Sequence, residues 1–546
     1  MDYKLEKPKK TQLNYDRMSA TQLEQVIKSQ EAEISELKQE LSNLMSMIRL
    51  NNSQKYGASG DNAAYPQGYE QLNFFNEAEK HGRLNEPEPS IESAVTKVQK
   101  KPKESGKKAK DLDGLAVTVI EHTLPEEEQA CPVCGNPLHD MKTEVTKTLK
   151  LVPAHFEVEE HRRHVYTCRE CEHNQSEGDK IPFIRAAMPE LPLPGSFASP
   201  ELLAGIINSK YVNHVPLARI EREFFRMDSV EISRQTMSNW MLAVAGRYMA
   251  PITERMREQL LGMEVLHADE TYCTVAYEDG QKSKKRCYMW VYCSGRYEIP
   301  IVYYEYHTSR AAESAEQFLR YYTGILHSDG YEVYHSLNAG ITVVGCLAHI
   351  KRKFTDAIKS LNDEEKKNTY CYKGQEYCDA LFHVEKRLKD LPPEERYHKR
   401  LIELKPVMDA FFEWLSENFP KTVPDSPAYK AFQYALNQWA YFKNILTDGR
   451  TEATNNRCER SIRPFTQGRR NWMTIKTNRG GASSAAIYSV IQTALENKLK
   501  IYEYLVYLFQ NLPSENLAIH PERIDQYVPW SKDLPANCYK SKNKES

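Results

Sequence analysis

The sequence predicts a multidomain α+β protein, because three different patterns follow one another along its 546 residues. Apolar side chains recur at coiled-coil spacing in residues 19–50, two Cys-x-x-Cys pairs lie between residues 131 and 171, and residues 259–360 alternate β-like and helical segments. A chain of this length can bury more than one hydrophobic core. Lys and Arg number 73 against 75 Asp and Glu, so any surface for nucleic acid has to be local.

Residues 1–50 are predicted to be a leader followed by a coiled coil. Steps of three and four separate the apolar positions, Gln30 fills one of them, and Asn51 ends the pattern. An amphipathic helix packed on its own protein would give the same pattern, but the terminal position and the Glu-, Gln- and Lys-rich far side favour a homo-oligomer. The apolar positions are Leu23, Ile27, Ile34, Leu37, Leu41, Leu44 and Ile48.

Residues 51–110 lack periodicity and are predicted to be a basic flexible linker. Their last part, residues 97–110, carries seven lysines against one glutamate. In a protein that handles DNA, such a run adds phosphate contacts that do not depend on sequence.

Residues 111–185 are predicted to form a zinc ribbon. Cys131 and Cys134, followed by Cys168 and Cys171, supply four thiolates, which suits one tetrahedral structural Zn²⁺. The interval between the pairs holds β-like runs, as expected where each pair caps a hairpin. A redox pair is the alternative, but two pairs together favour a metal.

Residues 186–258 carry apolar residues at helical spacing and are predicted to form a helical, helix-turn-helix-like domain. Ser233 is placed to cap a helix whose polar side presents Arg234 and Gln235, as in a recognition helix that contacts base edges. A plain helical bundle explains the same pattern equally well. The apolar side of this helix is expected to consist of Met237 and Trp240.

Residues 259–360 are predicted to form the first part of a ribonuclease-H-like α/β domain. Three β-like runs come first, and helices then alternate with two further β-like runs. In this order the central strands are neighbours and their ends meet. Residues 361–447 are charged, aromatic and helix-rich, so we expect a helical insertion with its aromatic side chains in its own core. Residues 448–500 then complete the domain, and residues 501–546 form a C-terminal helical tail.

Three acids in this domain fit a two-metal site. Asp269 and Asp329 each follow a short apolar, β-like run, so a strand end should present each of them. Glu459 lies in the first turns of a predicted helix, where the helix dipole favours its charged form. Carboxylate oxygens are the preferred ligands of Mg²⁺, for which Mn²⁺ may substitute in a two-ion site. Glu452 competes for the third position but precedes the helix, and Glu270 should point to the opposite face of its strand from Asp269.

The helix that carries Glu459 is expected to start at a capping Asn455 or Asn456 and to end at Pro464. Basic and aromatic residues follow Glu459 and suit contacts to phosphates and stacked bases. The residues expected to contact DNA here are Arg457, Arg460, Arg463, Arg469, Arg470, Asn471 and Trp472.

Five motifs occur in an order that closely resembles the DDE transposases of the insertion-sequence sixty-six family. They are His267-Ala-Asp-Glu-Thr271, Ser328-Asp-Gly-Tyr331, Cys346-Leu-Ala-His349, Asn455-Asn-x-x-Glu-Arg460 and Gly468-Arg-Arg-Asn-Trp472. The resemblance covers nearly the whole chain, because the cysteine pairs and the amino-terminal heptads also belong to that layout.

The resemblance implies a DNA transposase that cleaves the ends of a bacterial insertion sequence and joins the free 3′-hydroxyls to target DNA. Asp269, Asp329 and Glu459 would be catalytic and would hold two Mg²⁺ ions. His349, with Lys351 and Arg352 beside it, would lie near the scissile DNA. Terminal inverted repeats and target DNA are the implied partners, and a role for accessory proteins of the element stays open.

Two other classes of function fit some of these residues. A ribonuclease-H-fold nuclease would cleave without joining ends, and a regulator derived from a transposase would bind DNA without catalysis. We expect a cytoplasmic, nucleoid-associated bacterial protein, because the first ten residues lack the apolar core of a signal peptide. No run of the sequence approaches the roughly 18 apolar residues of a membrane span.

Overall fold

The computed structural model describes residues 154–167, 183–278 and 281–540, together with positions between 19 and 37. The chain divides into two compact units, one of Met1–Gly57 with Glu159–Ser546 and one of Ala58–Val158. The predicted linker and the four cysteines of the predicted zinc ribbon lie outside the described residues. Within the part that the structure describes, no helix is long and apolar enough to cross a membrane.

The described positions from Ala20 to Leu37 are helical, as the heptad pattern predicts. Ile27, Ile34 and Leu37 are each more than half exposed, at 52%, 51% and 57%. A helix that forms a coiled coil with another copy would expose such an apolar seam in the single chain. The coiled coil itself stays a prediction.

A short antiparallel ribbon joins β1 (Val165–Thr167) to β2 (Phe183–Arg185), with Tyr166 opposite Ile184. β1 lies within the predicted β-like region and ends one residue before Cys168. The ribbon thus brings together the two chain segments that flank the second cysteine pair.

Five strands form one mixed sheet with the order β5-β4-β3-β6-β7. β3 (Val265–Glu278), β4 (Gln281–Ser294) and β5 (Val302–His307) are antiparallel neighbours. β6 (Gly324–His327) pairs in parallel with β3, and β7 (Ile341–Val344) pairs in parallel with β6. The sheet therefore has β3 at its centre and two short parallel strands on one side of it.

Two helices connect the strands of the parallel half, and a third follows the last strand. They are α9 (Ala312–Leu319), α10 (Glu332–His335) and α11 (Leu347–Ile358). The predicted order of three strands followed by alternating helices and strands is confirmed.

Helices α17 (Asn456–Trp472) and α18 (Asn478–Glu496) pack against the strands from the carboxyl-terminal part of the chain. On α18, the hydroxyls of Thr493 and Ser489 accept hydrogen bonds from the backbone of Val302 and Tyr304, at 3.0 and 2.8 Å. These bonds satisfy N–H groups on the outer edge of β5, which would otherwise be an open sheet edge. Helix α19 (Ile501–Asn511) follows and packs on α5 (Pro200–Ile207).

The helices before the sheet share its hydrophobic core. The residues of this core range from Leu193 to Cys538 in the sequence, without those of the helical insertion. These helices include α6 (Leu217–Asp228), α7 (Arg234–Val244) and α8 (Ala250–Leu261), with α5 preceding them. Ser233 caps α7 by accepting the N–H of Thr236, as predicted. The predicted division of this helix is confirmed, because Met237 and Trp240 are buried while Arg234 and Gln235 are exposed.

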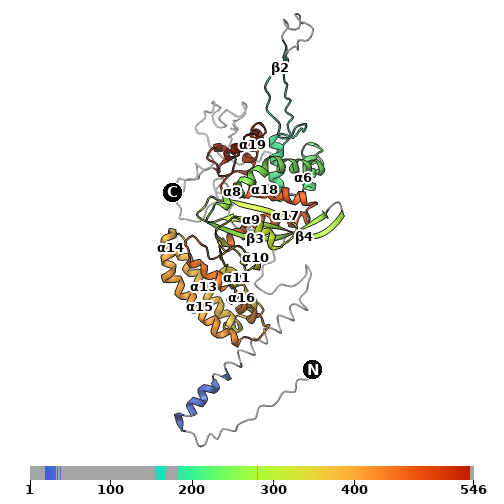
Figure 1. Ribbon diagram of the computed structural model, residues 1–546. Helices are drawn as coiled ribbons and strands as arrows, with labels where there is room; N and C mark the ends of the chain where they lie inside the picture. Colours follow the sequence, from blue (N-terminus) through green and yellow to red (C-terminus); the bar gives the residue numbers. More distant parts are fainter. Residues whose placement is uncertain are drawn as a thin grey trace, which may run out of the picture. The chain divides into compact units, whose positions relative to one another are not determined.

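The predicted helical insertion is a bundle with a second hydrophobic core of its own, and it also packs on α11 (Figure 1). Phe411, Phe432 and Phe442 are fully buried there, so their expected place in the bundle core is confirmed. The bundle consists of α12 (Asp363–Lys367), α13 (Tyr370–Leu388), α14 (Pro393–Lys399), α15 (Lys405–Asn418) and α16 (Pro427–Phe442).

A buried ionic cluster joins the bundle to the loop before α17. The Arg400 side chain is fully buried and donates two hydrogen bonds of 2.8 Å to the two carboxylate oxygens of Glu385. It also donates to the carbonyls of Ile445 and Asp448 at 3.0 Å and to that of Thr451 at 2.8 Å. One guanidinium group therefore fixes the chain that leads from the insertion to the helix carrying Glu459.

Replacing Glu385 with Gln should lower the free energy of unfolding by about 3–5 kcal/mol, because Arg400 and Arg396 would then be buried without their carboxylate. The bundle offers a matched control in the more exposed pair of Arg387 and Glu403. Glu403→Gln should change the stability by less than about 1 kcal/mol. Thermal unfolding of the full chain measures both variants, and equal stability of Glu385→Gln and the wild type would contradict the prediction.

The same cluster predicts how stability depends on pH. Burial alone would raise the pKa of Glu385, but hydrogen bonds to Arg400 and the charges of Arg400 and Arg396 lower it below its ordinary value of 4.5. The stabilisation from Glu385 is therefore complete above about pH 4.5 and is lost as the pH falls through the lower pKa of the folded state. The stability difference between the wild type and Glu385→Gln should shrink in that acid range.

Candidate active site

Asp269 and Asp329 lie at the same level of two neighbouring strands. β3 and β6 pair in parallel, and the last pair in this register is His267 with His327. Each aspartate follows its histidine by two residues. Because neighbouring strands lie about 4.8 Å apart, the register brings the two carboxylates to one place at the sheet edge.

The sequence predicted that a strand ends at Asp269, and this is wrong for β3 as a whole. β3 continues to Glu278, because its antiparallel pairing with β4 persists after the parallel pairing with β6 has ended. Cys273 and Val275 are buried along the extension, which favours its pairing. Asp269 therefore lies where β3 loses its neighbour on one side only.

The surroundings of Asp269 disfavour its negative charge. Burial raises its pKa well above the ordinary value, and the charges of Glu270, Asp329 and Glu459 raise it further. Its Oδ1 accepts the backbone N–H of Glu270 at 2.8 Å, and Asp329 Oδ1 accepts that of Tyr331 at 3.0 Å. Carboxylates gathered in this way favour a bound cation.

Glu459 lies in the first turn of α17. Helix α17 packs on β3 and β4, and its start is fixed by Asn455, which is fully buried. The Asn455 side chain donates to the carbonyl of Ala268, the residue before Asp269, at 2.7 Å. The charges of Asp329 and Glu459 both act on Asp269, although these acids come from distant parts of the chain.

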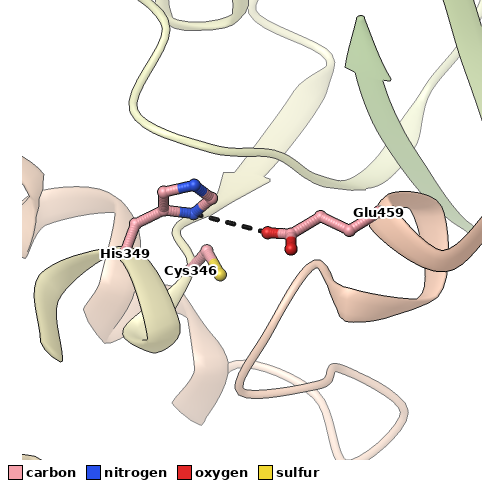
Figure 2. Close-up of side chains that lie close together, drawn as sticks. All are labelled: Cys346, His349 and Glu459. Atoms are coloured by element: carbon pink, nitrogen blue, oxygen red, sulfur yellow. Dashed lines mark ion pairs between the residues drawn. The ribbon is translucent and has the colours of Figure 1, made fainter. Parts of the chain in front are cut away.

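Cys346 and His349 lie beside Glu459 at the start of α11, and Figure 2 shows the imidazole and the carboxylate pointing toward one another. His349 Nδ1 is 3.8 Å from Glu459 Oε1, and Arg352 Nη2 is 3.9 Å from Oε2. One donor atom each from Cys346, His349 and Glu459 lies within 4.8 Å of the others, so this set could also hold a metal ion. Burial lowers the pKa of His349 despite the opposing charges of Asp329 and Glu459, which favours the neutral imidazole.

Glu270 is held by partners of its own. Arg310 donates to it through Nε at 2.9 Å, and the hydroxyl of Tyr334 donates at 2.9 Å. Burial raises the pKa of Glu270, and the bonds to Arg310 and Tyr334 oppose that shift. Both carboxylate oxygens of Glu270 therefore have partners within the protein.

Glu452, the competing third acid, lies in the loop before α17, as expected. Its carboxylate is 3.1 Å from His267 Nε2 and 3.3 Å from Arg457 Nε. Burial alone would raise the pKa of Glu452, but the hydrogen bond and charge of His267 and the charge of Arg457 lower it. Glu452 therefore contacts His267, two residues before Asp269, whereas the charge of Glu459 acts on Asp269 itself.

The expected end of α17 at Pro464 is wrong, because the helix continues to Trp472. Proline removes one backbone hydrogen bond from a helix interior. The buried face of α17 continues on both sides of Pro464, with Ile462 before it and Phe465 and Gly468 after it. Packing of that face against the sheet outweighs the lost bond.

Some of the α17 residues predicted to contact DNA are exposed, and others have partners within the protein. Arg460, Arg463 and Arg470 are exposed. Arg457 is engaged with Glu452, and Arg469 donates to Thr271 at 3.1 Å while its guanidinium lies 4.0 Å from the ring centre of Tyr272.

The end of α17 contacts the helical region before the sheet. Asn471 donates to the carbonyl of His214 at 2.9 Å, and Lys210 Nζ lies 3.9 Å from the ring centre of Trp472. These side chains therefore have partners within the protein. Their predicted contacts with DNA stay a prediction.

On α11, Lys351 forms an ion pair with Asp379 of α13, whereas Arg352 faces Glu459. Of these two basic residues, the structure therefore places only Arg352 beside the acids.

Nothing in the sequence indicates that the insertion approaches Asp329. At Gly330, next to Asp329, an added Cβ would lie 2.6 Å from the hydroxyl of Tyr434 and 2.9 Å from the amide carbon of Gln438, both on α16. Any larger residue at this position would require these two side chains to move. The Asp-Gly pair was visible in the sequence, but its partner lies about 100 residues away in a separate helix.

Comparison with known families agrees with this geometry. The family model described as "Transposase IS66 family" matches residues 195–483, which include all three acids. The chain belongs to the IS66 transposase family. The model of the zinc-finger binding domain of IS66 transposases matches residues 128–172, which include all four paired cysteines. Membership indicates a DNA-processing enzyme that binds DNA and carries a zinc-finger domain.

Proteins similar to this IS66 transposase occur in Sinorhizobium fredii. The uncharacterized protein y4hP is 28% identical over 430 residues, which cover 75% of this chain and 74% of that protein. The uncharacterized protein y4jD is 27% identical over 75% of this chain and 79% of its own length. The uncharacterized protein y4qI is 26% identical over 92% of each chain, so the likeness extends well beyond the catalytic region.

Proposed function

We propose that this IS66 transposase is a DDE enzyme that binds the ends of its insertion sequence, cleaves phosphodiester bonds there and joins the 3′-hydroxyl ends to target DNA. The observation that supports the proposal is that the charges of Asp329 and Glu459 both act on the buried Asp269. Asp269 on β3 and Asp329 after β6 each follow the last residue pair of two adjacent parallel strands by two positions, and Glu459 lies on a helix packed on the central strand. The strand order and the alternation that follows it fit a ribonuclease-H-like domain.

The residues present fit a pair of Mg²⁺ ions. The three carboxylates provide hard oxygen ligands. Burial and the mutual repulsion of the acids raise the pKa of Asp269, and a cation would relieve that repulsion. Among the described residues, no hydrogen-bond donor meets the buried Oε1 of Glu459. When bound, two such ions supply the Lewis acidity that activates the attacking oxygen and neutralises charge on the phosphate.

The chain's own side chains have separate tasks in this proposal. Asp269, Asp329 and Glu459 hold the cations, and His349 in its neutral form can accept or donate a hydrogen bond beside Glu459. Arg352 lies beside Glu459, and the arginines of α17 that are exposed suit DNA phosphates. Arg234 and Gln235 at the start of α7 are exposed and remain available for base edges.

The zinc-finger region is proposed to hold one structural Zn²⁺ through Cys131, Cys134, Cys168 and Cys171. Four thiolates in two closely spaced pairs match the tetrahedral coordination of structural zinc. The match of residues 128–172 to a zinc-finger domain supports this assignment.

A two-step assay tests the proposed function. The full chain is incubated with Mg²⁺ and a duplex that carries the terminal sequence next to its gene, and a supercoiled plasmid is then added as target. We expect cleavage at the end of the element, followed by joining of the 3′-hydroxyl to the plasmid. Cleavage without joining would indicate a nuclease, and binding without cleavage would indicate a regulator.

Deletion of residues 1–50 should lower the oligomeric order while leaving the catalytic fold intact. The exposed Ile27, Ile34 and Leu37 would lose their partner helix, and the pairing of element ends should weaken accordingly. Light scattering gives the mass in solution, and gel shifts with two labelled ends report synapsis. An unchanged mass with unchanged synapsis would reject the coiled coil as the oligomerisation element.

A further inference from the structure

Asn455 is the point at which the elements that carry the candidate ligands meet. It is fully buried, and its side chain donates to the Ala268 carbonyl of β3 at 2.7 Å. Its Oδ1 is 3.0 Å from His267 Nδ1, which therefore acts as the donor. Its backbone N–H donates to Cys346 Sγ, just before α11, at 3.2 Å.

The hydrogen-bond partners of Asn455 lie close in sequence to residues of the candidate active site. Ala268 immediately precedes Asp269, and Cys346 starts the helix that carries His349. The carbonyl of Asn455 accepts the N–H of Glu459 at 3.2 Å, so Asn455 also sets the first turn of α17. A shift of Asn455 would therefore move Glu459 relative to Asp269.

His267 links Asn455 to β6, the strand that precedes Asp329. Its ring stacks on that of His327 with 4.4 Å between centres, and its Nε2 is 3.1 Å from the carboxylate of Glu452. The backbone N–H of Glu452 donates to His327 Nε2 at 3.1 Å. Glu452 thus joins both histidines to the chain that leads into α17.

Asn455 does not use its side chain as an asparagine at a helix start usually does. It occupies the cap position of α17, where a side-chain oxygen normally accepts an N–H of the first turn. It makes no such bond, and both of its side-chain polar atoms face β3 instead. The side chain therefore positions the helix on the sheet and leaves the helix end uncapped.

We propose that Asn455, together with His267 and Glu452, forms a positioning unit that holds Glu459 against Asp269 and Asp329 at the spacing which the metal ions require. The inference rests on the proposed function, because it assumes that these three acids bind the ions. Metal sites tolerate only small errors in ligand position, about 0.2 Å in bond length. Loosening the unit should therefore weaken metal binding before it affects DNA binding.

The test compares Asn455→Ala with Asn444→Ala in the full chain. Asn444 donates a similar side-chain bond to the carbonyl of Val343, at 2.8 Å, but contacts no part of the unit. Titration with Mn²⁺, followed by electron paramagnetic resonance, measures metal affinity without DNA. We expect at least about tenfold weaker binding in Asn455→Ala, and affinity close to wild type in Asn444→Ala.

Cleavage of the terminal duplex is then measured against Mg²⁺ concentration. We expect the half-saturating Mg²⁺ concentration of Asn455→Ala to rise about tenfold, with most of the rate recovered at saturation and with unchanged DNA affinity. Glu452→Gln, which keeps the size of the side chain, should show the same change to a smaller degree. It also provides the test if Asn455→Ala does not fold.

Metal affinity equal to that of Asn444→Ala in these variants would overturn the inference, because the residues would then serve stability alone. If the wild type cleaves with Mg²⁺, that outcome leaves the proposed function intact. A wild type that binds neither Mn²⁺ nor Mg²⁺ at the three acids would overturn both.

Discussion

Asp269→Asn, Asp329→Asn and Glu459→Gln should each lower end cleavage and strand transfer by about a thousandfold or more. An amide keeps the shape of the side chain but removes the charge that holds Mg²⁺. Loss of metal assistance removes several kcal/mol of stabilisation of the transition state, and about 4 kcal/mol corresponds to roughly a thousandfold in rate. The two-step assay with Mg²⁺ and the terminal duplex measures this effect.

DNA binding should survive these substitutions, because it depends on lysine and arginine contacts, and the loss of a repulsive carboxylate can even strengthen it. Asp390→Asn is a suitable control, since its carboxylate is 87% exposed and meets Arg296 at the surface. Glu452→Gln separates the two candidates for the third acid and should retain cleavage at saturating Mg²⁺. If all three primary variants still cleave, the proposed two-metal mechanism fails. If Glu452→Gln alone is inactive, Glu459 is the wrong third ligand.

Local signals in the sequence mark the two aspartates of the proposed site. An apolar β-like run followed by Asp269, and a second one followed by Asp329, mark strands by patterns a few residues long. The order of strands and helices around them also follows from such short patterns. Glu459 was preferred over Glu452 because Glu452 precedes the predicted helix, and the resemblance to a family also selects Glu459.

What the sequence could not predict depends on contacts between distant residues. Asn455 suggests a helix cap in the sequence, but its side-chain partners on β3 lie 187 and 188 positions away. Arg400 stands among many charged residues, and only the fold shows that it is fully buried against the loop at 445–451. Likewise, only the fold shows that Tyr434 of the insertion lies close to Gly330.

Two errors in the predicted element ends have a common physical origin. A strand was expected to stop at Asp269 and a helix at Pro464, because a charged residue or a proline usually interrupts an element. In both cases, the element continues because a neighbour packs against it on the far side. β4 continues along β3, and the sheet continues along the buried face of α17.

Removal of zinc should unfold the region around residues 128–172 while the catalytic fold persists. Structural zinc contributes on the order of 10 kcal/mol or more to the folding of small domains, more than such a domain gains from its core alone. We expect one zinc per chain in the wild type, and none in the Cys131→Ser, Cys134→Ser double variant. Limited proteolysis should then cut within residues 111–185 in the variant or after chelation.

Cys371→Ala is the matched control, because Cys371 is buried in the helical bundle with no partner cysteine in a Cys-x-x-Cys pair. It should keep its zinc and resist proteolysis at residues 111–185. If the pairs are redox centres instead, the purified wild type will contain no zinc, and thiol titration will find the pairs oxidised. Because thiolates bind zinc only when deprotonated, the metal should also leave as the pH falls, and protease sensitivity should appear over the same pH range.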